Sequence, residues 1–169
     1  RDSAEWFAEY ASVVVNRLSD RVGNWMTINE IQCFVNLGYR YGMGAPGLSL
    51  PFPRVLDVIH NALLAHGGAV QAIRAGATRP CRVGCASAGF TMVPATQTPA
   101  DIEAARRAML GDHPLAWDSA WFMDPIMVGV YPEKTLPGDA VLPSIHAGDM
   151  ERIRQPLDFF GINIYSGTR

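Results

Sequence analysis

The chain has 169 residues, of which 49% are hydrophobic and 18% are charged, and its formal net charge is −2. This length suffices for one domain with a substantial core, and the composition excludes a disordered chain. The slight negative charge argues against a nucleic-acid partner, because no basic stripe is available to neutralise phosphates. No apolar stretch approaches the length of a membrane span, so we expect no membrane partner.

The cysteines and the first residue bear on the protein's location. Cys33, Cys81 and Cys85 form no paired framework, and an odd count is typical of free thiols in a reducing compartment, which favours the cytoplasm. Cys81 and Cys85 lack a second ligand pair at zinc spacing, so we expect no metal site. The chain starts at Arg1 without a signal peptide, and we therefore expect the natural start to lie upstream.

The first part of the chain predicts a helix, a strand and a second helix. Asp2 and Glu5 form a capping-box pattern before an apolar stripe, which predicts a core-facing helix that ends near Ser19. A strand is predicted at Asn24–Asn29, and a long connection rich in turn residues follows it. Apolar spacing then predicts a helix over 54–75. The stripe of the first helix comprises Trp6, Phe7, Tyr10, Val13, Val14, Arg17 and Leu18.

The second part of the chain continues the alternation of strands and helices. Pro99 is suited to the first position of a helix, because its missing N–H has no intrahelical partner there. Asp124-Pro125 predicts the end of a later helix. In chain order, the predicted elements are a strand at 82–87, a helix at 98–109, a helix at 115–123, a loop at 131–143, a short helix at 149–154 and a buried strand at 158–164.

This order of elements predicts the fold class. Strands that alternate with long helical segments form βα units around a parallel sheet. Only three strands are predicted, whereas a closed (β/α)₈ barrel takes about 250 residues. The sequence therefore predicts an α/β fold that forms part of a (β/α)₈ barrel.

The strand that ends at Asn29 and Glu30 indicates a candidate site. Its last residues place an amide and a carboxylate at the carboxyl end of a parallel sheet, where active sites of such folds lie. By spacing alone, Glu30 is more often part of a surface salt bridge, and Asn29 as often bonds to its own backbone. A polar strand end is likewise the simple interpretation of Asn163 and Tyr165.

Two motifs resemble family 1 of the glycoside hydrolases, the β-glucosidases and their relatives. Thr-Ile-Asn-Glu, which ends at Glu30, resembles the family's Thr-x-Asn-Glu segment. The run from Asp158 to Tyr165 resembles its Asp-Phe-x-Gly-x-Asn-x-Tyr strand. Shorter segments agree in order along the whole chain. The resemblance implies that residues 1–169 are the central part of one catalytic domain, strands four to six with their helices, without the N- and C-terminal strands.

The resemblance also implies a role for each site residue. Glu30 would be the acid/base of a retaining β-glycosidase that hydrolyses terminal β-D-glycosides, without a cofactor. Asn29 and Asn163 would contact the sugar, and the hydroxyl of Tyr165 would orient the nucleophilic carboxylate. Such an acid must stay protonated near neutral pH, so we expect burial or a nearby negative charge to disfavour its anion. In retaining enzymes the two carboxyls lie about 5–5.5 Å apart.

The chain departs from the family pattern in two places. The family usually has Pro directly after the acid/base Glu, whereas this chain has Ile31, whose φ no ring fixes. The family's nucleophile lies in a Glu-Asn-Gly segment on the seventh strand, and no such segment occurs here. We therefore expect a fragment of an enzyme that carries the acid/base but not the nucleophile and that is inactive alone.

Two alternatives remain open. A non-catalytic half-barrel would bind carbohydrate or assemble into a homo-oligomer through its exposed barrel edges. A different retaining barrel family with a similar Asn-Glu strand end would also fit Glu30. For His60 and His66 we expect a packing role, because no third ligand completes a metal motif around them.

Overall fold

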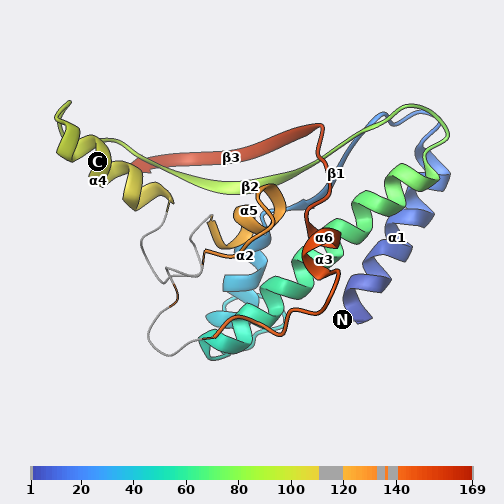
Figure 1. The fold of residues 1–169 in the computed structure, drawn as a ribbon, viewed down its shortest axis with the longest axis horizontal. Helices are drawn as coiled ribbons and strands as arrows, with labels where there is room; N and C mark the ends of the chain where they lie inside the picture. The colour runs from blue at the N-terminus through green and yellow to red at the C-terminus, as the bar shows by residue number, and fades with distance from the viewer. Residues whose placement is uncertain (1, 111–119, 133–135, 137–140, 169) are drawn as a thin grey trace.

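Three parallel strands form the sheet of the computed structural model, which describes residues 2–110, 120–132, 136 and 141–168. The order in the sheet is β1 (Asn24–Asn29), β2 (Arg82–Met92) and β3 (Phe159–Thr168), so the central strand pairs with both others. In Figure 1 the strands run along the top, and most of the helices lie beneath them. The predicted α/β fold with a parallel sheet is confirmed.

The helices lie mainly on one face of this sheet. Their bounds are α1 (Asp2–Leu18), α2 (Ile31–Val35), the π-helix η1 (Asn36–Arg40), α3 (Phe52–Gly76), α4 (Pro99–Leu110), α5 (Ala120–Met127) and α6 (Asp149–Ile153). On the opposite face, the side chains of Met26 and Tyr165 are 57% and 83% exposed. No helix in the described part of the chain is long and apolar enough to cross a membrane.

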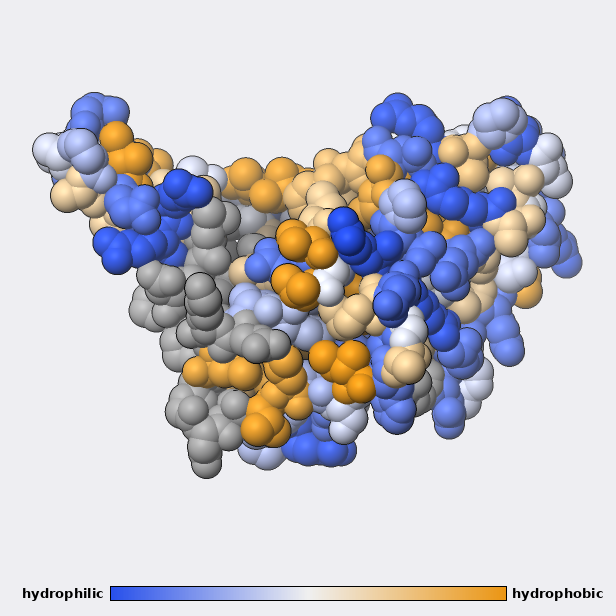
Figure 2. All heavy atoms as spheres, viewed as in Figure 1, coloured by the Kyte–Doolittle hydropathy of each residue, from blue (hydrophilic) through white to orange (hydrophobic). Residues whose placement is uncertain are grey.

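The long helix α3 organises the core. Its side chains Leu56, Ile59 and Leu63 are buried against α5, which contributes Trp121 and Phe122. Further along, Val70 and Ile73 pack with α1 and β2. Gly67 lies so close to α6 that a Cβ there would be 1.8 Å from the carbonyl oxygen of Arg152. Figure 2 shows hydrophobic atoms gathered over α5 and the start of α3, and mainly hydrophilic atoms over α1 and α6.

Each edge strand carries one irregularity of register. Met26 pairs with Gly84 and Asn29 with Ala86, so β1 has one more residue than β2 in this interval. The register of β3 shifts in the same way before Gly167. A bulge bends a strand and re-aims the side chains that follow it. The bulge in β1 comes directly before the polar end of that strand.

The first helix has the predicted bounds, but only part of the predicted apolar stripe, which includes Phe7, packs against the core. Trp6, Tyr10 and Val13 are between 62% and 65% exposed, although they belong to the predicted core-facing stripe. The buried face instead carries Ala4, Ala11 and Val15. Small side chains let α1 approach α3 closely. The helix therefore packs through its small residues, whereas the large side chains of Trp6 and Tyr10 remain exposed.

Two predicted strands are longer in the structure. β2 continues to Met92 instead of ending at residue 87, because its last residues pair with β3 as far as Thr168. β3 was expected to be buried, but Ile162 and Ile164 are 55% and 52% exposed. β3 forms an edge of the described sheet, and a cavity of about 450 Å³ separates it from α4 and α5.

The loop and helix predictions need two further corrections. The connection after β1 contains the helices α2 and η1. Helix α5 runs through Pro125 to Met127 rather than ending at Asp124-Pro125. Burial of Pro125 and Ile126 offsets the lost backbone hydrogen bond. Residues 115–119 of that predicted helix, and residues 133–135 and 137–140 of the predicted loop, lie outside the described residues.

Two histidines of α3 are buried and hydrogen-bonded. His60 lies 2.8 Å from the hydroxyl of Tyr131 through Nδ1 and 3.1 Å from Asp149 through Nε2. Nδ1 of His66 lies 2.7 Å from the hydroxyl of Thr27 on β1. Burial lowers the pKa of His66 to about 4. These contacts join α3 to β1, α6 and the segment after α5.

We expect the free energy of unfolding to fall as the pH decreases from about 6.5 to about 4. In this window His66 takes up a proton in the unfolded chain but not in the folded one, because its folded pKa is about 4 and its ordinary value is 6.5. The gap corresponds to at most about 3 kcal/mol. In urea unfolding, the free energy of unfolding of His66→Gln should depend less on pH than that of the parent protein. The exposed control His146→Gln should show the same pH dependence as the parent. Equal slopes in all three proteins would contradict this assignment.

Candidate active site

Glu30 occupies a strained turn between β1 and α2. Its backbone has φ 51° and ψ 58°, the left-handed conformation, and it is the one non-glycine residue with positive φ in the described ranges. Its N–H donates to the carbonyl oxygen of Ala86 at 2.9 Å, and its own carbonyl accepts from the N–H of Cys33 at 2.9 Å. Such strain costs about 1–3 kcal/mol and is typical of functional sites.

The structure brings the four predicted site residues together where β1 ends, beside the middle of β3. Nδ2 of Asn163 donates to Oε1 of Glu30 at 2.8 Å and to Oδ1 of Asn29 at 3.0 Å. The hydroxyl of Tyr165 lies 3.4 Å from the same Oε1. Asn29 is the last residue of β1 and Glu30 follows it, whereas Asn163 and Tyr165 belong to β3, so the contacts cross β2.

Small side chains on β2 make this crossing possible. Ala86 pairs with Asn29 on one side, and Ala88 pairs with Asn163 on the other. A larger side chain at either of these positions of β2 would separate Glu30 from Asn163. The site therefore depends on the central strand, although that strand contributes no functional group to it.

The surroundings of Glu30 favour its charged form. The amide of Asn163 lowers the pKa of Glu30 most, the thiol of Cys33 and the hydroxyl of Tyr165 lower it further, and partial burial raises it. The expectation that the site disfavours the anion is therefore wrong for the described residues. Within the part of the chain that the structure describes, no second carboxylate is among the groups that shift this pKa. In a retaining site, a neighbouring carboxylate raises the pKa of the acid.

Two residues near Glu30 were not identified from the sequence. The thiol of Cys33 donates to the Glu30 carboxylate, and burial together with this bond raises the pKa of Cys33 to about 11. The amide of Gln32 is buried against β2, where it bonds to Ser87 and Ala88. The three-residue spacing of Glu30 and Cys33 is a signal for the first contact, since it places both on one side of a helix start.

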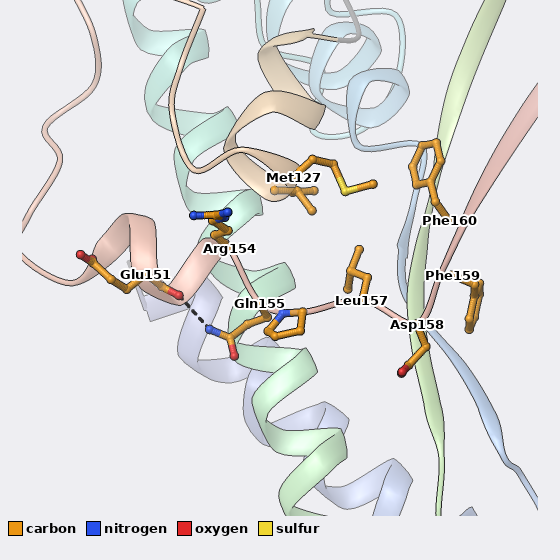
Figure 3. A pocket seen from close by; sticks show the side chains of 10 residues that line it. Met127, Glu151, Arg154, Gln155, Leu157, Asp158, Phe159 and Phe160 are labelled. Atoms are coloured by element: carbon orange, nitrogen blue, oxygen red, sulfur yellow. Dashed lines mark hydrogen bonds between the residues drawn. The ribbon is translucent and has the colours of Figure 1, made fainter.

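Of two cavities in the structure, one borders the candidate site and the other lies away from it. One of about 570 Å³ borders Asn29 and is lined by aromatic side chains that include Phe34 and Tyr39. A larger one of about 690 Å³ lies between α5, α6 and the start of β3. Figure 3 shows Met127 and Phe160 facing this space. Because it lies at the amino end of β3, it is separate from the candidate site.

The described residues offer no obvious metal centre. No group of three or more histidine, cysteine, aspartate or glutamate side chains is placed to hold an ion anywhere in the part of the chain that the structure describes. The chemistry available at the site is that of one carboxylate, two amides, a phenol and a thiol. This set suits hydrogen bonding to hydroxyl groups together with proton transfer by Glu30.

A parallel sheet covered by helices, with a carboxylate and two amides where its first strand ends, is typical of part of a (β/α)₈ barrel. The chain matches the model of glycosyl hydrolase family 1 over residues 1–169, and it belongs to that family. The predicted family and the predicted partial barrel are both confirmed.

Three relatives illustrate the similarity. The 1,4-β-D-glucan glucohydrolase of Thermotoga neapolitana is 36% identical over 169 residues, which cover 99% of this chain and 38% of that protein. The virulence factor SghA from Agrobacterium tumefaciens has a TM-score of 0.78 at 33% identity, with 98% of this chain and 36% of that one covered. The family 1 β-glucosidase from Thermotoga maritima has a TM-score of 0.74 at 32% identity, and the match covers 99% of this chain and 36% of that one. The chain thus spans little more than a third of these relatives.

We expect Asn163→Ala to raise the pKa of Glu30. The amide of Asn163 donates to the carboxylate, stabilises the charged form and is the largest cause of the lowered pKa, so its removal shifts the titration to higher pH. Carboxyl ¹³C shifts of labelled glutamate, followed by NMR against pH, measure this directly. Asn24→Ala, at the opposite end of β1, is the control. An unchanged Glu30 midpoint in Asn163→Ala would show that the contact does not stabilise the carboxylate.

Proposed function

We propose that this chain is part of a retaining β-glycosidase of the β-glucosidase type, in which Glu30 is the acid/base. The observation that carries the proposal is the 2.8 Å bond from Asn163 to Glu30, made across the sheet beside Asn29. Both asparagine side chains bond to hydroxyl groups of the sugar in this proposal. SghA has been solved with its substrate analogue salicin, and the Thermotoga maritima enzyme with deoxynojirimycin, which supports a small-molecule β-glycoside as ligand.

The proposed reaction has two steps. Glu30 gives its proton to the glycosidic oxygen while a second carboxylate bonds to the anomeric carbon and the aglycone leaves. Glu30 then takes a proton from water, whose oxygen bonds to that carbon and releases the carboxylate. The second carboxylate comes from outside residues 1–169 in this proposal. Its charge would oppose the effect of Asn163 on Glu30, and the exposed hydroxyl of Tyr165 would donate to it and orient it.

Residues 1–169 would then be the central part of one catalytic barrel domain. The similarity to the glucohydrolase and the β-glucosidase of the two Thermotoga species favours this over a non-catalytic half-barrel. The free thiols of Cys33, Cys81 and Cys85 support a reducing location such as the cytoplasm.

A chimera provides the test of Glu30. Residues 1–169 replace the matching segment of the Thermotoga neapolitana glucohydrolase, and kcat/KM is measured for aryl and alkyl β-glucosides. Glu30→Gln should lower kcat/KM about 10²–10⁴-fold for methyl β-glucoside, whose leaving group needs a proton. The loss should be much smaller for 2,4-dinitrophenyl β-glucoside, which leaves as a stable anion. Glu9→Gln, on the exposed side of α1, is the control. Equal losses for the two substrates would refute the acid role.

We expect the 169-residue chain alone to show no measurable turnover of aryl β-glucosides. One carboxylate can protonate a leaving group, but it cannot also capture the anomeric carbon from the other side of the ring. Release of nitrophenol from a purified sample is the measurement. Turnover that survives purification and disappears with Glu30→Gln would contradict the proposal that the nucleophile lies elsewhere.

A further inference from the structure

The turn that carries Glu30 is bonded to the central strand on the amino side of α2. The N–H of Glu30 donates to the carbonyl oxygen of Ala86 at 2.9 Å, and the carbonyl of Glu30 accepts from Cys33. The left-handed backbone of Glu30 is unfavourable for a residue with a side chain. Such a conformation persists only where the surrounding structure determines it, so further contacts must hold the turn.

Gln32 supplies these contacts from the other side of the turn. Its side chain is 1% exposed, and its Nε2 donates to Oγ of Ser87 at 2.7 Å and to the carbonyl oxygen of Ala88 at 2.8 Å. The carbonyl of Gln32 in turn accepts from Nδ2 of Asn36, a fully buried residue, at 2.8 Å. Residues 86–88 of β2 therefore receive three hydrogen bonds from Glu30 and Gln32.

We propose that Gln32 is a positioning residue that fixes the direction of the Glu30 carboxylate toward Asn163. Its two bonds to β2 tie the first turn of α2 to the strand that also holds the backbone of Glu30. Without them, the backbone of Glu30 can relax from the left-handed region, and its side chain then turns away from Asn163. The catalytic meaning of this role rests on the proposed function, but the placement of the carboxylate is independent of it.

The first test follows Glu30 itself in the 169-residue chain. Gln32→Met keeps the length of the side chain and removes both donated hydrogen bonds. The pKa of Glu30 should then rise toward its ordinary value, because the carboxylate leaves Asn163, Cys33 and Tyr165, which together lower it. Gln71→Met makes the same change at an exposed position of α3 and should leave the titration unchanged. Both are measured by NMR with labelled glutamate.

A purely structural role gives a different result. In that case Gln32→Met lowers the melting temperature while the titration of Glu30 stays that of the parent, and the inference is overturned. If Gln32→Met does not fold, Ser87→Ala replaces it, because this variant removes one of the two bonds and leaves the one to Ala88. A smaller rise in the pKa of Glu30 is then expected, and no rise in folded Ser87→Ala overturns the inference.

The second test measures catalysis in the chimera described above. Gln32→Met should lower kcat/KM about tenfold or more for methyl β-glucoside and less than about threefold for 2,4-dinitrophenyl β-glucoside, since a misplaced acid matters most for the poorer leaving group. The outcomes can be told apart. If the loss of kcat/KM in Glu30→Gln depends on the leaving group, whereas Gln32→Met lowers kcat/KM equally for both substrates, the inference fails and the proposed function stands. If Glu30→Gln shows no such dependence, the proposed function fails, and the titration alone decides the role of Gln32.

Discussion

The small side chains of the central strand are the constraint on which the site depends. β2 pairs with both other strands, so the contacts of Asn29 and Glu30 with β3 pass over it. Gly84 already lies so close to β3 that a Cβ there would be 2.4 Å from the carbonyl oxygen of Phe159. Further along, Ala86 and Ala88 leave room for Asn163 to reach Glu30. Substitution of these small residues by larger ones would disturb sheet packing and polar geometry together.

Local sequence patterns predicted the elements whose signals lie within them. The strand at Asn24–Asn29 occurs as predicted, and the helix predicted over 54–75 occurs as Phe52–Gly76. The grouping of Asn29 and Glu30 with Asn163 and Tyr165 also occurs as expected, although it lies at the end of β1 and in the middle of β3, which continues to Thr168. Such features need no knowledge of the distant neighbours of a residue.

The features that sequence analysis missed depend on tertiary contacts. The packing face of α1 is decided by how closely α3 approaches, which favours Ala11 over Trp6. The extra length of β2 comes from its pairing with β3, a partner far away in the chain. Gln32 resembles an ordinary polar helix residue in the sequence, and only the position of Ser87 reveals it as buried and bonded. In each case the local sequence allows more than one structure, and a residue far away in the chain determines which one forms.

Positioning and protonation of Glu30 have separate physical origins. Hydrogen bonds within the described residues fix the left-handed turn and direct the carboxylate toward Asn163. Of these bonds, the one from Asn163 also lowers the pKa of Glu30, which opposes the protonated state that an acid catalyst needs. A donor such as Asn163 cannot avoid this conflict, because any hydrogen bond that orients a carboxylate also stabilises its charge. A working acid/base at this position therefore needs a compensating negative charge that reaches Glu30 without displacing Asn163. A second carboxylate about 5–5.5 Å away meets both conditions, because it is near enough to raise the pKa and too far to compete for the amide.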